Sequence, residues 1–171
     1  MKKLLIGVSM LMMLPFIACE DNKADETKNT INIIEITTDN VNDGDYYFNF
    51  AEGAKNSTTW HLSYKNLDAG DGNYMPIFKL ANTVMLNVDE SLKFEDITKI
   101  PNISSFAPSN GKLGYMGEHE VLTYDMQIHQ ISVSDSNYII YDTISHKVFK
   151  IHFDEYSGGI VIFRFAELIS E

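Results

Sequence analysis

Short runs of β-branched and aromatic residues recur from residue 31 to residue 165, and clusters of Gly, Asn, Asp and Ser separate them. In two of the runs an aromatic or aliphatic residue occupies every second position: Tyr46, Phe48 and Phe50 in the first, and Trp60, Leu62 and Tyr64 in the second. Such alternation is typical of a β-strand with one buried face. In the second run it predicts that His61 lies on the opposite, solvent-facing side.

Further strand signals lie at residues 31–36, 75–88, 122–131, 138–143, 148–153 and 160–165. Residues 75–88 are long enough for two short strands, whereas residues 122–131 alternate like one unbroken strand. Residues 144–147 have the length of a hairpin connection, and residues 66–73 and 102–117 have the composition of loops. These signals predict an all-β fold with mostly antiparallel strands.

One segment, residues 89–100, departs from the strand pattern. Leu92, Ile97 and Ile100 fall near helical spacing, and acidic residues fill the first turn, where they complement the helix dipole. Pro101 follows directly. The sequence therefore predicts one short helix in an otherwise β protein.

Residues 1–18 (MKKLLIGVSMLMMLPFIA) have the features of an export signal. Two lysines precede an apolar run that is too short for a stable membrane span. The run ends at Ala18, directly before Cys19, which is the only cysteine of the chain. We therefore expect a lipoprotein signal peptide, with the lipid on Cys19. An ordinary secretory signal that leaves a free thiol is the alternative.

Residues 19–30 are charged and polar and contain no aromatic residue. This composition predicts a flexible acidic tether. An acidic run directly after the lipidated cysteine resembles the surface-export signal of Bacteroidota lipoproteins, which implies an outer-membrane lipoprotein at the cell surface. A tether that faces the periplasm is the alternative. Residues 31–171 are enough for a single β domain.

Acidic residues outnumber basic ones, with 24 Asp and Glu against 13 Lys and Arg and a formal net charge of −11. The signal peptide holds two of the 13 lysines and arginines and no acid, so its removal leaves 11 and a charge of −13. A domain this acidic repels phosphate, which argues against nucleic acid as a partner. The chain has no nucleophile elbow, P-loop or H-E-x-x-H motif, so we do not expect an enzyme.

Side chains able to bind a metal or a porphyrin gather in one region: Tyr115, Met116, His119, Tyr124, Met126 and His129. Two neutral axial donors, from His or Met, are what haem iron takes when it is held rather than used for chemistry. Aromatic side chains would supply a dry pocket. The alternative is that both methionines fill the core and both histidines lie on the surface. The spacing of the histidines matches no compact zinc site.

Three segments of the C-terminal half, YDMQIH (124–129), YIIYDT (138–143) and KIHFDEY (150–156), resemble the closing strands of the HmuY-like haem-binding lipoproteins of Bacteroidota. The strands around residues 46–50, 60 and 159–165, and residues 94–101 before a proline, fit the same family pattern. The likeness covers most of residues 40–166. It departs from the family at His61, where relatives tend to have Asp, and at Ser145-His146, where they have an Asp-Gly turn.

The resemblance implies an all-β haemophore that clamps haem at one end between two axial ligands. Members of the family capture haem, often from host haemoproteins, and pass it to a TonB-dependent outer-membrane haem transporter. Matched residue by residue, the second iron ligand falls on Met126, with His129 close by. The first ligand lies in a shortened segment, where Met116 and then His119 are the candidates.

The same resemblance implies that Tyr115 and Tyr124 line the haem pocket and that Lys112 meets a propionate. Strict alternation would place Met126 and His129 on opposite faces of an unbroken strand, so we expect only one of them to bind iron. A second hypothesis is that the protein has the same fold but has lost the haem site and binds another partner. The shortened segment favours this alternative.

Overall fold

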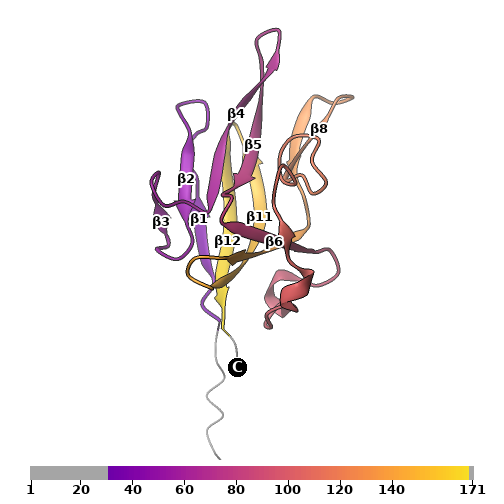
Figure 1. Ribbon diagram of the computed structural model, residues 1–171. Coiled ribbons are helices and arrows are strands. Elements are labelled where there is room, and N and C mark those ends of the chain that lie inside the picture. The colour runs from indigo at the N-terminus through magenta and orange to yellow at the C-terminus, as the bar shows by residue number, and fades with distance from the viewer. Residues whose placement is uncertain (1–30, 170–171) are drawn as a thin grey trace, which may run out of the picture.

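The computed structural model describes residues 31–169, in which two antiparallel sheets and a separate hairpin make up the fold (Figure 1). The predicted signal peptide, Cys19 and the tether lie outside the described residues. Sheet A has six strands in the order β1-β12-β11-β10-β6-β7, and sheet B has four in the order β3-β2-β4-β5. Every pair of neighbouring strands is antiparallel. The predicted all-β, antiparallel fold class is confirmed.

The strands of sheet A are β1 (Ile34–Thr37), β6 (Val84–Asp89), β7 (Ala107–Pro108), β10 (Asn137–Asp142), β11 (Val148–Ser157) and β12 (Ile160–Leu168). The strands of sheet B are β2 (Tyr46–Asn49), β3 (Ala54–Lys55), β4 (Leu62–Gly70) and β5 (Asn73–Leu80). The separate hairpin consists of β8 (Leu122–Asp125) and β9 (Gln130–Val133).

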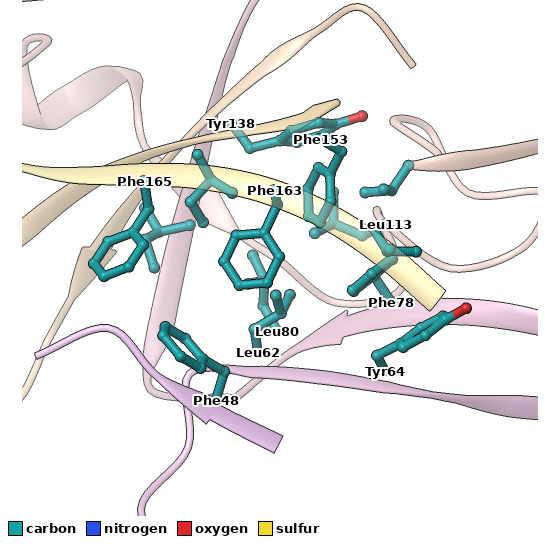
Figure 2. Packing of buried hydrophobic residues seen from close by; sticks show 14 of the residues in the cluster. Phe48, Leu62, Tyr64, Phe78, Leu80, Leu113, Tyr138, Phe153, Phe163 and Phe165 are labelled. Carbon is teal, nitrogen blue, oxygen red and sulfur yellow. The ribbon is translucent and has the colours of Figure 1, made fainter. Parts of the chain in front are cut away.

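The main core lies between the two sheets. Figure 2 shows Phe48 and Leu62 of sheet B on the side that faces Phe163 and Phe165 of sheet A. The ring of Phe48 meets both sheet A rings edge to face, with centroid distances of 5.5 Å. Edge-to-face packing is a favoured aromatic geometry. The buried aromatic face predicted for residues 46–50 is confirmed.

Sheet A is also covered on its other face. Ile97 and Phe106, from the segment between β6 and β7, pack there against Ile139, Val148 and Leu168. Burial on both faces explains why β10 and β11 read as nearly continuous apolar runs rather than as alternating ones.

The helix predicted for residues 89–100 is wrong. The segment contains a single 3₁₀ turn, η1 (Phe94–Asp96), and a second turn, η2 (Ile103–Ser105), follows it. The carboxylate of Asp89 accepts hydrogen bonds from the backbone N–H groups of Ser91 and Leu92, and buried Lys150 donates to the carbonyl of Phe94 at 2.6 Å. These side-chain contacts hold the segment in turns, and so short a helix is marginal by itself.

The loop predicted for residues 66–73 is also wrong, because β4 and β5 continue through it to a two-residue turn at Asp71 and Gly72. Both turn residues have positive φ, 53° and 77°. Two-residue hairpin turns favour this left-handed backbone because its twist matches that of the strands. The result is a long hairpin that projects from the end of sheet B (Figure 1).

His61 is buried rather than solvent-facing, with 7% of its surface exposed. It precedes β4, and its Nδ1 accepts a hydrogen bond from the backbone N–H of Phe50 at 3.1 Å. Its Nε2 lies 3.5 Å from a carboxylate oxygen of Asp142. Burial lowers the pKa of His61, and the nearby Asp142 opposes that shift only in part. Alternation misplaced this residue because the strand begins one position later.

Candidate functional site

The sequence-predicted site residues lie on two adjoining segments, the loop of residues 109–121 and the β8–β9 hairpin that follows it. In Figure 1 this hairpin and the β4–β5 hairpin lie at the upper end, whereas the described residues nearest the two chain ends lie at the lower end. The backbone N–H of Ser134 donates to the carbonyl of Val121, and the hydroxyl of Tyr138 donates to the carbonyl of Glu120. The first bond closes the base of the hairpin, and the second ties the end of the loop to β10 of sheet A.

The unbroken strand predicted for residues 122–131 is a hairpin instead, with a turn between Asp125 and Gln130. The carboxylate of Asp125 accepts hydrogen bonds from the backbone N–H groups two and three residues further on, at 2.7 and 3.4 Å. His129 closes the turn with a φ of 52°, and its Nδ1 lies 2.6 Å from the hydroxyl of Tyr124. The chain therefore bends between Met126 and His129, so strand alternation does not place them on opposite faces.

The same turn occurs a second time between β10 and β11. Tyr141 and His146 are also five residues apart, their hydroxyl and Nδ1 are also 2.6 Å apart, and His146 has a φ of 59°. Asp142, directly after the tyrosine, accepts hydrogen bonds from the backbone of the turn. We call this arrangement the Tyr-Asp turn. Its recurrence indicates that the Tyr124–His129 contact stabilises a turn. The three residues between the aspartate and the histidine differ between the copies, and Met126 takes the place of Thr143.

Met116 lies at the tip of the loop of residues 109–121, with a φ of 58° that is uncommon for a residue with a side chain. The carboxylate of Glu120 accepts a hydrogen bond from the backbone N–H of Met116. Gly117, next in the chain, is closely surrounded, because a Cβ there would lie 2.6 Å from the carbonyl oxygen of Lys112 and 2.7 Å from that of Gly114. The loop is therefore tightly folded around a glycine that no other residue could replace without a shift.

The two methionines have the most exposed large apolar side chains in the part of the chain that the structure describes. Met116 is 82% exposed and Met126 is 78% exposed. The alternative in which both fill the core is therefore wrong. Both thioethers lie in solvent, on backbone that hydrogen bonds to Glu120 and Asp125 hold in place.

The aromatic and charged candidate residues differ from one another in exposure and in the contacts that they make. Tyr115 is 42% exposed and Tyr124 is 37% exposed, so both rings have a free face. Lys112 and His119 both approach Glu118, with Nζ at 3.3 Å and Nε2 at 3.5 Å from its carboxylate. Lys112 would therefore bind another carboxylate by releasing Glu118. The Nε2 of His119 points toward the same glutamate.

Two exposed apolar residues of the β4–β5 hairpin escaped the sequence-based prediction. Tyr74 is 63% exposed and Leu67 is 42% exposed. Tyr74 pairs with Asp68 and Leu67 pairs with Met75, so the two side chains lie on opposite faces of the hairpin. β5 also contacts β8. Leu67 lies in the predicted loop of residues 66–73, and Tyr74 lies between that loop and the strand signal of residues 75–88, so no sequence signal places either side chain beside the candidate site.

No group of three or more His, Cys, Asp and Glu residues within residues 31–169 could hold a bare metal ion. Over the same residues, no helix has the length and apolar character needed to cross a membrane. No family model, curated protein or solved structure matches the chain. The class that the fold defines is an all-β protein of two antiparallel sheets with a loop-and-hairpin site at one end.

Proposed function

We propose that the protein is a cell-surface outer-membrane lipoprotein, anchored through Cys19, that binds haem and passes it to a TonB-dependent transporter. The observation that supports this function best is the exposure of Met116 and Met126 on two adjoining, tightly folded segments. Thioether sulfur is a suitable axial donor to haem iron. The donor set thus fits the cofactor that the sequence resemblance implies.

In this proposal Met116 and Met126 hold the iron, and Tyr115 and Tyr124 contact the porphyrin faces. Haem would supply an iron that binds soft donors, and the protein would supply the two thioether sulfurs and the apolar walls. Lys112 exchanges its contact with Glu118 for a propionate. His129 keeps its contact with Tyr124 through Nδ1, which leaves Nε2 as a second-choice donor; His119 is a weaker candidate because Glu118 already engages it.

The site lies at the opposite end of the molecule from the described residues nearest the proposed anchor. An anchor at that end would direct the methionines away from the membrane, toward host haemoproteins or a transporter. The acidic charge of the domain gives no long-range attraction for an anionic porphyrin, so affinity has to come from ligation and burial.

A haemin titration tests this function. A chain that starts at Glu20 is titrated with haemin under oxidising and then reducing conditions, and the Soret band and the emission of Trp60 are recorded. We expect a shifted Soret band at one haem per chain. Met126→Ala and Met116→Ala should each weaken binding at least about tenfold, which corresponds to about 1.4 kcal/mol.

His146→Ala is the matched control for His129→Ala, because the two residues have the same place in the two Tyr-Asp turns. Equal, small effects of both would assign the iron to the methionines. A large effect of His129→Ala alone would move the ligand to that histidine. The absence of any Soret change in both oxidation states would reject haem binding.

The second candidate function is a binding module for another macromolecule on the same surface. Exposed Tyr74 favours it, because this ring lies on β5, which contacts β8, and adds an apolar side chain to those that haem ligation needs. Tyr74→Ala distinguishes the two functions: it should leave the Soret titration unchanged if haem is the ligand of the loop and hairpin alone.

A further inference from the structure

A pocket of about 430 Å³ lies near the described residues closest to the chain ends, far from the candidate haem site. Rings from both sheets line it, together with aliphatic residues near the two ends of the chain: Phe50, Phe149, Phe165, Ile31, Ile34 and Ile169. Its volume falls within the range of about 300–1,000 Å³ that is usual for small-molecule pockets. Nothing in the proposed haem function uses it.

No cationic side chain is among the described residues that line the pocket. Two carboxylates take part in its lining, and both already have donors. Glu52 accepts hydrogen bonds from the side-chain amides of Asn49 and Asn56, and Glu167 accepts one from Lys147 at 2.9 Å. A hydrocarbon chain fits the apolar walls, and an anionic head group would be repelled by Glu52, because neutral amides leave its charge in place whereas Lys147 pairs with Glu167. The ligand chemistry is therefore an acyl chain in a neutral ester linkage.

The position of the pocket indicates where such a chain comes from. Ile31 and Asn32 line it, and Cys19 lies twelve residues before Ile31. Twelve residues span at most about 40 Å when fully extended, so a lipid on Cys19 is within reach. A ligand attached through a short linker has an effective concentration of the order of millimolar, which a free lipid does not reach.

We propose that one ester-linked acyl chain of the lipid on Cys19 occupies this pocket. The inference rests on the proposed lipoprotein and extends it from an attachment to a reversible contact between the anchor and the fold. When one acyl chain lies in the pocket, only the remaining acyl chains of the anchor insert into the membrane. Membrane affinity falls with each acyl chain that is withdrawn.

The first test uses the chain that starts at Glu20, which keeps every described strand and both core clusters. The probe is 1-monopalmitoylglycerol, a neutral ester, and binding is counted by native mass spectrometry. We expect one lipid per chain and weaker binding of palmitate. Ala51→Phe, at an exposed position that lines the pocket, should abolish binding. Thr58→Phe, exposed and outside the pocket lining, is the matched control and should bind as the parent chain does.

The second test uses the mature lipidated protein and measures its co-sedimentation with neutral phosphatidylcholine vesicles. If the acyl chain competes between the pocket and the bilayer, Ala51→Phe should raise the vesicle-bound fraction several-fold, and Thr58→Phe should not. Thr98→Phe, which fills the same pocket from the η1 side, replaces Ala51→Phe if that variant melts at a lower temperature than its control.

The possible results separate the steps of the inference. Failure of 1-monopalmitoylglycerol to bind would overturn the pocket as an acyl-chain site. Binding in the first test without a change in the second would overturn the role of the anchor and leave a site for a free lipid. Absence of lipid on Cys19 by mass spectrometry would refute the lipoprotein and this inference together, while the first test would still report on the pocket.

Discussion

The two Tyr-Asp turns allow one substitution to be compared in a buried and in an exposed setting. Asp142 is 3% exposed and accepts hydrogen bonds from the backbone of Ile144 and Ser145, at 3.0 and 3.1 Å, and from the Ser145 hydroxyl at 2.5 Å. His61 lies beside it. Although burial alone would raise it, these hydrogen bonds lower the pKa of Asp142. Asp125 makes the equivalent backbone contacts on the exposed hairpin.

Asp142→Ala should lower the free energy of unfolding by about 3–5 kcal/mol, because it removes a buried carboxylate that accepts hydrogen bonds from Ile144 and Ser145, and bonds to charged groups contribute about 1.5–3 kcal/mol each. Asp125→Ala should lower it by only about 0.5–1.5 kcal/mol, since water replaces the lost contacts. The expected difference is therefore about 2–4 kcal/mol. For a domain with a typical stability of about 5–15 kcal/mol, the first change is a large fraction of the total.

Urea unfolding at pH 7, followed by Trp60 fluorescence and far-UV circular dichroism, measures both variants in the chain that starts at Glu20. The slope of unfolding free energy against urea has to stay constant for the comparison to hold. Asp142→Asn, which keeps the shape and one acceptor, should fall between the parent and Asp142→Ala. Losses for Asp142→Ala and Asp125→Ala that agree within about 0.5 kcal/mol would refute the distinction between a buried and an exposed turn.

Three further predictions concern pH, the core and the loop. Because the pKa of His61 is lowered from 6.5 in the fold, the unfolded chain takes up the proton first, so stability should fall as pH drops below about 6.5. His61→Asn should flatten this dependence of stability on pH, measured by urea titrations at several pH values. An unchanged pH dependence would contradict the assignment. Phe163→Ala should lower the free energy of unfolding by about 3–5 kcal/mol in the same assay. Ile160→Ala, at an exposed position, should lower it by less than about 1 kcal/mol. Similar losses for the two variants would mean that the core is misplaced. The backbone N–H of His119 donates to the carbonyl of Lys112, and Gly117→Ala should speed hydrogen exchange at this N–H without changing exchange in the strands. An unchanged exchange rate at His119 would show that the loop tolerates a Cβ.

The strands were predictable wherever alternation reports burial directly. Tyr46, Phe48 and Phe50 face the core as their spacing requires, and Leu62 and Tyr64 do the same on the next strand. His61 was misplaced because periodicity does not reveal where a strand starts. The Asp71-Gly72 turn was missed because the polar residues around it resemble an irregular loop, although Asp-Gly is a strong hairpin signal.

The site was predictable in composition but not in shape. Met116 and Met126 were singled out as soft donors, and their exposure could not be read from the sequence because methionine is usually a core residue. The bend at residues 126–129 was detectable in principle, since YDMQIH and YDTISH share the tyrosine, the aspartate and the histidine at the same spacing. Nothing in the sequence indicated that Lys150 is buried, because only the fold places Phe94 over it.

β1 has a single neighbour, β12, and the two strands come from opposite ends of the described chain. Ile34 pairs with Phe165, and Thr38 exchanges hydrogen bonds with Val161 across 123 residues. Contacts this distant in sequence form late, because a large loop has to close before they contribute. As the ribosome releases the chain from its N-terminus, sheet A has no partner for its first strand until the last has emerged. Loss of β12 would therefore expose one edge of β1 and one edge of β11 that are paired in the intact sheet, and both would be open to pairing with other chains.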